Sequence, residues 1–244
     1  MHSKLVDSKA TSSIVIWAFD GLQPDQITPE LMPNLSSFAT QGVEFNNHHA
    51  VFPTVTRVNV ASMQTGRYPG GHGLAANNLV IREFAPHQTT PALRGSLSQI
   101  KESLGQVLLA PTLGDLLGKT GREYVAIGIG SDGNAYLQNP NILESGGATI
   151  HPEFCLPHIL HEELTERFGP WPEKTSPDTV RLAHAVQIMT EYVLPERAPA
   201  VSMLWCSEPD SIQHKRGVGS EGSVRALADA DEQFGRLMEW ADSA

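Results

Sequence analysis

Three short segments of the chain are almost continuously apolar and end in polar turns. They are residues 14–19, 124–129 and 200–206. This pattern is typical of strands in a parallel sheet, because helices cover both faces of such a sheet. Segments with helical spacing separate the strands and cover residues 33–39, 58–65, 112–117, 156–168, 176–194 and 222–240. The alternation of the two patterns predicts an α/β fold with a mostly parallel central sheet.

Two other regions are less regular. Residues 43–51 fit a further strand. Residues 78–110 are poorly periodic and are interrupted by prolines and a glycine, so we expect a loop-rich insertion there. The sequence contains no internal repeat, low-complexity tract or linker that would divide it, and we expect residues 1–244 to form one α/β domain.

Composition limits where the protein acts and what it binds. The net charge of −10 argues against binding to a nucleic-acid backbone or an anionic membrane surface. Residues 1–13 are polar and carry no secretory signal pattern, and the first apolar run is too short to span a bilayer, so we expect a cytoplasmic protein. The two cysteines, Cys155 and Cys206, fit a reducing compartment and offer no thiolate cage. Any metal ion must therefore be held by oxygen and imidazole ligands.

Carboxylates stand at the ends of two predicted strands. Asp20 follows the first strand and Asp210 follows the last, and the carboxyl ends of parallel strands meet at one edge of a sheet. His214 comes four residues after Asp210, so both side chains can reach one cation if the chain turns helically there. Each feature also has an ordinary interpretation, because Asp-Gly is common turn chemistry and aspartate often caps a helix.

Thr56 lies at or near the start of the helix predicted at residues 58–65. A threonine hydroxyl is a weak nucleophile at neutral pH, but a bound metal and a helix N-terminus together favour its alkoxide form. Threonine at a helix cap is otherwise routine. The neighbouring Arg57 has two interpretations, a contact to phosphate or ester oxygens and a solvated helix residue.

Together these segments resemble the nucleotide pyrophosphatase/phosphodiesterase (type I phosphodiesterase) branch of the alkaline phosphatase superfamily. The segments that match are Phe19-Asp20-Gly21, Met32-Pro33-Asn34-Leu35, Phe52-Pro53-Thr54-x-Thr56-x-x-Asn59, Thr65-Gly66-x-Tyr68-Pro69-x-x-His72-Gly73, Asn77 and Glu208-Pro209-Asp210-x-x-x-His214. The similarity covers residues 14–78 and 200–220. It implies an alkaline-phosphatase-like three-layer α/β/α sandwich, which we expect to be incomplete in this chain.

The resemblance also implies a role for each candidate site residue. Thr56 is the nucleophile and forms a phosphothreonine intermediate. Two divalent metal ions, expected to be zinc, are bound, one by Asp20 and Thr56 and the other by Asp210 and His214. The Asn77 amide and the Thr56 backbone N–H hold a nonbridging phosphate oxygen.

The chain departs from the family in its metal ligands. The family completes the metal pair with a downstream Asp-His dipeptide and a last histidine, but His214 is the last histidine here and three expected ligands are absent. Catalytic zinc sites have about three protein ligands each. We therefore expect a truncated chain that binds zinc weakly and has negligible turnover. The remaining histidines of the second strand region and the middle of the chain are interpreted as surface or packing residues, namely His48, His49, His87, His151, His158, His161 and His184.

Three functions stay open at this point. The leading hypothesis is a metal-dependent hydrolase of phosphodiester or pyrophosphate bonds, acting on a small phosphate ester such as a nucleotide. A phosphonate or phosphomonoester hydrolase of the same superfamily would keep the nucleophile and metals and change the leaving-group pocket. A truncated or degenerate relative that binds phosphate or metal without turnover is the alternative of a different class.

Overall fold

A five-stranded sheet forms the centre of the computed structural model, which describes residues 13–243. In spatial order the strands are β1 (Ile14–Phe19), β7 (Val201–Cys206), β4 (Tyr124–Gly128), β5 (Ala148–His151) and β6 (Phe154–Leu156). The first four run parallel, and β6 runs antiparallel to β5. The prediction of an α/β fold with a mostly parallel sheet is confirmed. The polar segment 1–12, which supported the expectation of a cytoplasmic protein, lies outside the described residues.

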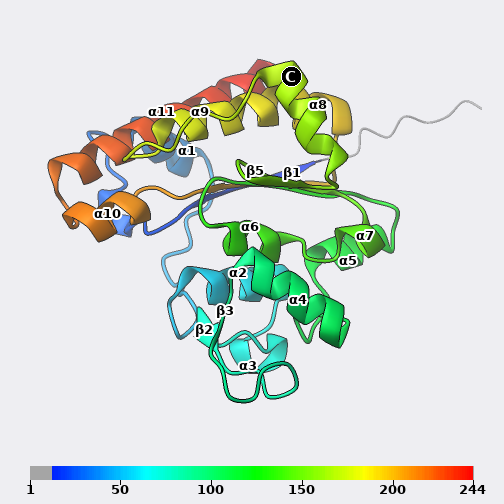
Figure 1. Ribbon diagram of the computed structural model, residues 1–244. Helices are drawn as coiled ribbons and strands as arrows, with labels where there is room; N and C mark the ends of the chain where they lie inside the picture. Colours follow the sequence, from blue (N-terminus) through cyan, green and yellow to red (C-terminus); the bar gives the residue numbers. More distant parts are fainter. Residues whose placement is uncertain (1–12, 244) are drawn as a thin grey trace, which may run out of the picture.

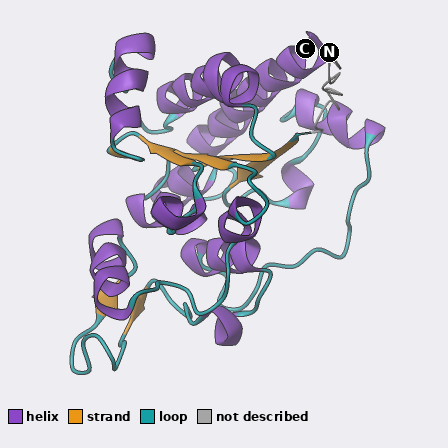
Figure 2. Cartoon of the chain, turned by 90° about the vertical axis from the view of Figure 1, so that its right-hand side faces the viewer, coloured by secondary structure: helices purple, strands orange, loops and turns teal. Residues whose placement is uncertain are grey.

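Helices cover both faces of the sheet and make three layers (Figure 1). One face carries α1 (Pro33–Gln41), α8 (Ile159–Phe168), α9 (Thr179–Ile188) and α11 (Glu221–Ser243). The opposite face carries α2 (Thr56–Thr65), α4 (Arg94–Leu104), α5 (Leu113–Gly118), α6 (Asp132–Gln138) and α7 (Ile142–Ser145). Figure 2 shows the sheet edge-on between the two helical layers.

Each helical layer packs on its own hydrophobic core. Along β4, Val125 and Ile127 belong to the core under α8, α9 and α11, whereas Tyr124 and Ala126 belong to the core under α2, α4 and α6. Successive side chains of a strand point to opposite faces, so one continuous apolar run serves both cores. Burial of apolar surface, at about 25 cal/mol per Å², is the main force that joins the layers.

Short elements connect the layers. They are the 3-10 helix η1 (Pro24–Gln26), α3 (Pro69–His72), the antiparallel hairpin of β2 (Asn78–Leu79) and β3 (Thr90–Pro91), the π-helix η2 (Met189–Arg197) and α10 (Asp210–Arg216). The hairpin lies below the layer that contains α2 and α4, away from the central sheet (Figure 1). Among residues 13–243, no helix has both the length and the apolar character needed to cross a membrane.

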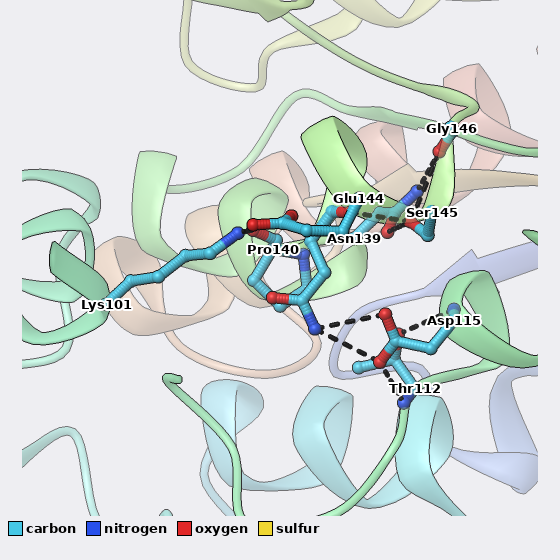
Figure 3. A network of polar contacts seen from close by, with 9 residues as sticks. Lys101, Thr112, Asp115, Asn139, Pro140, Glu144, Ser145 and Gly146 are labelled. Atoms are coloured by element: carbon cyan, nitrogen blue, oxygen red, sulfur yellow. Dashed lines mark hydrogen bonds and ion pairs between the residues drawn. The ribbon is translucent and has the colours of Figure 1, made fainter. Parts of the chain in front are cut away.

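A polar network fastens α4, α5 and α7 to one another (Figure 3). Lys101 on α4 pairs with Glu144 on α7 at 2.9 Å. Asn141 donates to both oxygens of Asp115 at 3.1 Å, and Asp115 closes a reciprocal capping box with Thr112 at the start of α5. These contacts link the three helices within one layer of the fold.

The strand predicted at residues 43–51 is wrong. The segment is a loop in which Asn46 and Asn47 turn the chain, and Val43 and Phe45 are exposed. Asparagine favours turns because its side chain bonds to nearby backbone groups in place of a strand partner.

Helix boundaries also differ from the sequence prediction. The helix predicted at residues 176–194 begins at Thr179 and passes through Pro195, because the chain widens into the π-helix η2. The Ala198 N–H donates to the Val193 carbonyl at 3.0 Å, the five-residue step of a π-helix.

The middle of the chain contains more regular structure than its periodicity indicated. Residues 78–110 include α4, whose Leu97 and Ile100 are buried, and Gly95 sits in its first turn beside open space. We also did not predict α6, α7, β5 and β6, since elements of three to seven residues are too short to show a period. The insertion at 78–110 and the single-domain organisation stay predictions.

Candidate active site

The carboxyl ends of β1 and β7 bring Asp20 and Asp210 together. The Asp20 N–H extends the strand pairing by donating to the Cys206 carbonyl at 3.0 Å, and the Asp210 N–H donates to the Asp20 carbonyl at 2.9 Å. Gly21 has a φ of +73°, and a Cβ atom there would lie 2.9 Å from the Asp210 Cα. Glycine tolerates both conditions, so the Asp20-Gly21 turn lets the two acid-bearing segments touch.

Thr56 is the first residue of α2, as the sequence predicted, and it faces Asp20. Its Oγ1 donates to the two Asp20 carboxylate oxygens at 3.4 and 3.3 Å. The residue before it, Val55, provides no side-chain cap for the helix. Asn59 holds this corner in place, because it accepts from the Val51 N–H at 2.9 Å and donates to the Val55 carbonyl at 3.1 Å. The uncapped N–H groups of the first turn therefore stay available to an anion.

All five predicted site residues line one cavity of about 300 Å³, namely Asp20, Thr56, Asn77, Asp210 and His214. His214 lies on α10, one turn after Asp210, and its Nε2 is 3.3 Å from an Asp210 carboxylate oxygen. The His214 side chain is 79% exposed, so it borders the cavity from the solvent side. A larger cavity of about 540 Å³ between the β2–β3 hairpin and α4 has mostly apolar walls and contains none of these residues.

Burial and the neighbouring Asp210 disfavour the charged form of Asp20. Burial, followed by the Asp210 charge, raises the pKa of Asp20 to about 6. Hydrogen bonds from the Trp205 indole N–H, at 3.1 Å, and from Thr56 oppose that shift, as does the nearby His214. A cation between the two carboxylates would relieve this repulsion.

The chemical types of the side chains that line the cavity suit a divalent metal ion. Carboxylate and imidazole groups, which are the ligands that zinc accepts besides thiolates, converge on the cavity beside the Thr56 hydroxyl. The Asn77 Oδ1 is buried without a hydrogen-bond partner, so no protein donor holds this side chain through its oxygen. In number the donors fall short, since among residues 13–243 no group of three or more Asp, Glu, His or Cys side chains is arranged to hold a metal.

Several residues in or beside the cavity carried no signal in the sequence. Ser131 and Asn134 come from the start of α6, and Lys174 comes from the loop before α9. Trp205 is part of β7 and reaches Asp20 from the neighbouring strand. None of these residues belongs to a recognisable spacing pattern, and only the fold brings them to the site.

Comparison with known proteins agrees with the motifs. A family model described as type I phosphodiesterase / nucleotide pyrophosphatase matches residues 14–244. Rat ectonucleotide pyrophosphatase/phosphodiesterase family member 3 is 26% identical over 234 residues, which cover 93% of this chain and 22% of the rat protein. The chain thus spans about a fifth of the length of this relative.

Solved structures share the fold. Murine ectonucleotide pyrophosphatase / phosphodiesterase 5 in complex with AMP matches with a TM-score of 0.66 and 17% identity, covering 95% of this chain and 53% of the other. Phosphonoacetate hydrolase from Sinorhizobium meliloti 1021 in complex with phosphonoformate matches with a TM-score of 0.71 and 18% identity, covering 94% and 54%. These likenesses confirm the alkaline-phosphatase-like three-layer fold. With the family model spanning nearly every described residue, the chain belongs to the type I phosphodiesterase / nucleotide pyrophosphatase family.

Proposed function

We propose that this chain contributes the nucleophile and part of the metal ligands to a hydrolase of phosphodiester or pyrophosphate bonds. The observation that carries the proposal is the position of the Thr56 hydroxyl, 3.3 Å from Asp20 at the uncapped start of α2. Asn77, Asp210 and His214 border the same cavity. A hydroxyl, an anion-binding helix end and cation-binding carboxylates are the parts that phosphoryl transfer requires.

Thr56 acts as the nucleophile in this proposal. Its hydroxyl loses its proton to solvent, and Oγ1 forms a bond to phosphorus while the bond to the leaving oxygen breaks and that oxygen keeps the electron pair and takes up a proton from solvent. The backbone N–H groups at the start of α2 and the Asn77 amide stabilise the nonbridging oxygens. Water then attacks the phosphothreonine, the bond from phosphorus to the threonine oxygen breaks, and inorganic phosphate or a phosphomonoester leaves with net retention of configuration.

Two divalent cations, expected to be zinc, complete the proposed site. Asp20 and Thr56 would hold one, and Asp210 and His214 would hold the other. When bound, such ions favour the alkoxide of the nucleophile and neutralise charge on the leaving oxygen. Each ion receives two donors from these residues, fewer than the three typical of catalytic zinc, so we expect weak binding to the 244-residue chain.

Two neighbouring functions use the same residues. A phosphonate hydrolase is favoured by the match to phosphonoacetate hydrolase, whose coverage of this chain is as high as that of the nucleotide pyrophosphatases. A non-catalytic relative that binds phosphate or one metal is favoured by the incomplete donor set.

The test measures zinc content and release of nitrophenolate from bis(p-nitrophenyl) phosphate. The 244-residue chain is compared with a longer chain in which the family's Asp-His pair and last histidine follow these residues. We expect weak zinc uptake and negligible turnover in the first, and turnover in the second that falls by more than about a thousandfold in Thr56→Ala. Thr54→Ala, which removes an exposed hydroxyl two residues away, is the matched control and should retain turnover.

Each outcome separates the hypotheses. Turnover retained in Thr56→Ala refutes the threonine nucleophile. Tight uptake of two zinc ions by the 244-residue chain contradicts the incomplete donor set. A longer chain that takes up two zinc ions and hydrolyses neither diesters, pyrophosphates nor phosphonates identifies the non-catalytic relative.

A further inference from the structure

The cavity has two chemically different ends. Thr56 and Arg57 are consecutive on α2, but they contact different strand ends. Thr56 donates to Asp20, which follows β1, whereas the Arg57 Nη2 donates to the Ser131 Oγ at 3.2 Å, in the turn that follows β4. Because β7 separates β1 from β4, the two strand ends lie roughly 10 Å apart. Acidic side chains line one end of the cavity, and Arg57 lines the other.

Arg57 has unused hydrogen-bonding capacity at this end. Its Nε is buried and has no hydrogen-bond partner. Within residues 13–243, no carboxylate lies close enough to Arg57 to form an ion pair. The Asp132 carboxylate interacts electrostatically with Arg57 without pairing with it. The two Asp132 oxygens instead accept from the N–H groups of Gly133 and Arg94 at 2.6 and 3.3 Å. A half-buried guanidinium without a counterion costs free energy until an anion pairs with it.

A second cationic side chain, that of Lys174, lines the same cavity, and hydrogen bonds anchor the loop that carries it. Lys174 lines the cavity, and the next residue, Thr175, donates its N–H to Asp178 at 3.2 Å. The Asp178 N–H in turn donates to the Glu208 carboxylate at 3.0 Å, and both of these acids are buried. The loop that carries Lys174 is therefore anchored to the segment that leads into α10.

We propose that Arg57, Ser131 and Lys174 form a subsite for a second anionic group of the substrate, beside the phosphorus that Thr56 attacks. The inference rests on the proposed function and deepens it by assigning the substrate class. That class consists of phosphoryl compounds that carry a further phosphate or carboxylate, in preference to diesters with two uncharged substituents. Arginine suits this role because its planar guanidinium donates to two oxygens of one anion.

The test uses binding in EDTA, so that neither turnover nor metal ions contribute. Methylphosphonate supplies one anionic group, methylenebisphosphonate adds a second phosphonate, and phosphonoacetate adds a carboxylate. Dissociation constants are measured by NMR titration for the wild type, Arg57→Gln and Lys174→Met. Arg67→Gln, which removes an exposed arginine outside the cavity, is the matched control, and thermal unfolding verifies that each variant is folded.

We expect Arg57→Gln to raise the dissociation constant of one or both doubly anionic ligands about tenfold or more. The dissociation constant of methylphosphonate should change by less than about twofold. Lys174→Met should give the same pattern with a smaller change, because this side chain is exposed. Selective loss of the bisphosphonate identifies a phosphate subsite, and selective loss of phosphonoacetate identifies a carboxylate subsite. Equal weakening of all three ligands, or no binding of either doubly anionic ligand to the wild type, overturns the proposal. The nucleophile assignment is untouched by either result, because no turnover is measured.

Discussion

Two pairs of neighbouring acids lie at the same edge of the sheet, and they are built in different ways. Asp178 and Glu208 are 0% and 2% exposed, and their oxygens accept from backbone N–H groups, including that of Ile212 on α10 at 3.0 Å. Asp20 and Asp210 open instead onto a cavity, where Asp20 meets a hydroxyl and an indole N–H.

The comparison teaches that a raised pKa does not by itself locate a functional site. Burial raises the pKa of Asp20, Asp178 and Glu208 alike. In the buried pair three of the four carboxylate oxygens accept a backbone N–H, and only the Asp178 Oδ2 has no partner, so these acids join one segment to another. In the cavity pair the carboxylates keep lone pairs directed at open space, which is the property that a metal ion or a substrate can use.

The buried pair should be the more important for stability, and Glu208→Ala is the strongest test. The change leaves the N–H groups of Asp178 and Ile212 without partners in a buried region. We expect the free energy of unfolding to fall by about 3 kcal/mol, measured by urea denaturation. Glu239→Ala, an exposed glutamate on α11, is the control and should have little effect. A loss of unfolding free energy as small as that of the control would show that Glu208 does not hold these segments together.

The cavity pair depends on the close approach at Gly21. Gly21→Ala places a Cβ 2.9 Å from Asp210 at a positive φ, whereas Gly66→Ala has a similar φ of +62° with open space around it. We expect a loss of about 1 kcal/mol for Gly66→Ala from the backbone conformation, and about 2 to 3 kcal/mol for Gly21→Ala from conformation and overlap together. Equal losses in thermal or urea unfolding would contradict the contact between the two segments.

The pH dependence of stability should reveal the buried pair. The folded-state pKa of Asp178 is raised by burial, so the folded protein holds that proton more tightly than the unfolded chain does. Stability from this group is therefore present at low pH and is lost as the pH rises through the folded-state pKa. As the pH rises from acid to neutral, we expect the wild type to lose unfolding free energy relative to Asp178→Asn, because the variant has no proton to lose at this position. A difference that does not change with pH contradicts this assignment.

The smallest effect on stability is expected at the Asp20 carboxylate. Asp20→Asn removes one of two repelling charges and keeps an acceptor for the Trp205 and Thr56 hydrogen bonds, so the unfolding free energy should change by less than about 1 kcal/mol. Zinc binding, followed by calorimetry, should nevertheless weaken further from its low starting value. A large loss of stability would show that Asp20, like Glu208, holds segments of the fold together, and it would contradict the difference between the two pairs.

The sequence by itself determined the local parts of this protein. The continuous apolar runs located β1, β4 and β7 because strands covered on both faces exclude polar residues, and Asp20 and Asp210 followed at their ends. Spacing and capping patterns located α2 with Thr56 at its start. These features depend on neighbours within a few positions, so they can be recognised without the fold.

The tertiary structure decided which parts meet. Strand order placed β7 between β1 and β4, which put the Trp205 indole on Asp20 and let Arg57 reach Ser131. The loop that carries Lys174 comes to the cavity because the Thr175 N–H donates to Asp178, whose own N–H donates to the buried Glu208 carboxylate. Such contacts join residues many positions apart, and their energy depends on burial and geometry that no local pattern encodes. For this reason the acids and the threonine could be predicted, whereas Arg57 kept two interpretations and Ser131 and Lys174 were not found.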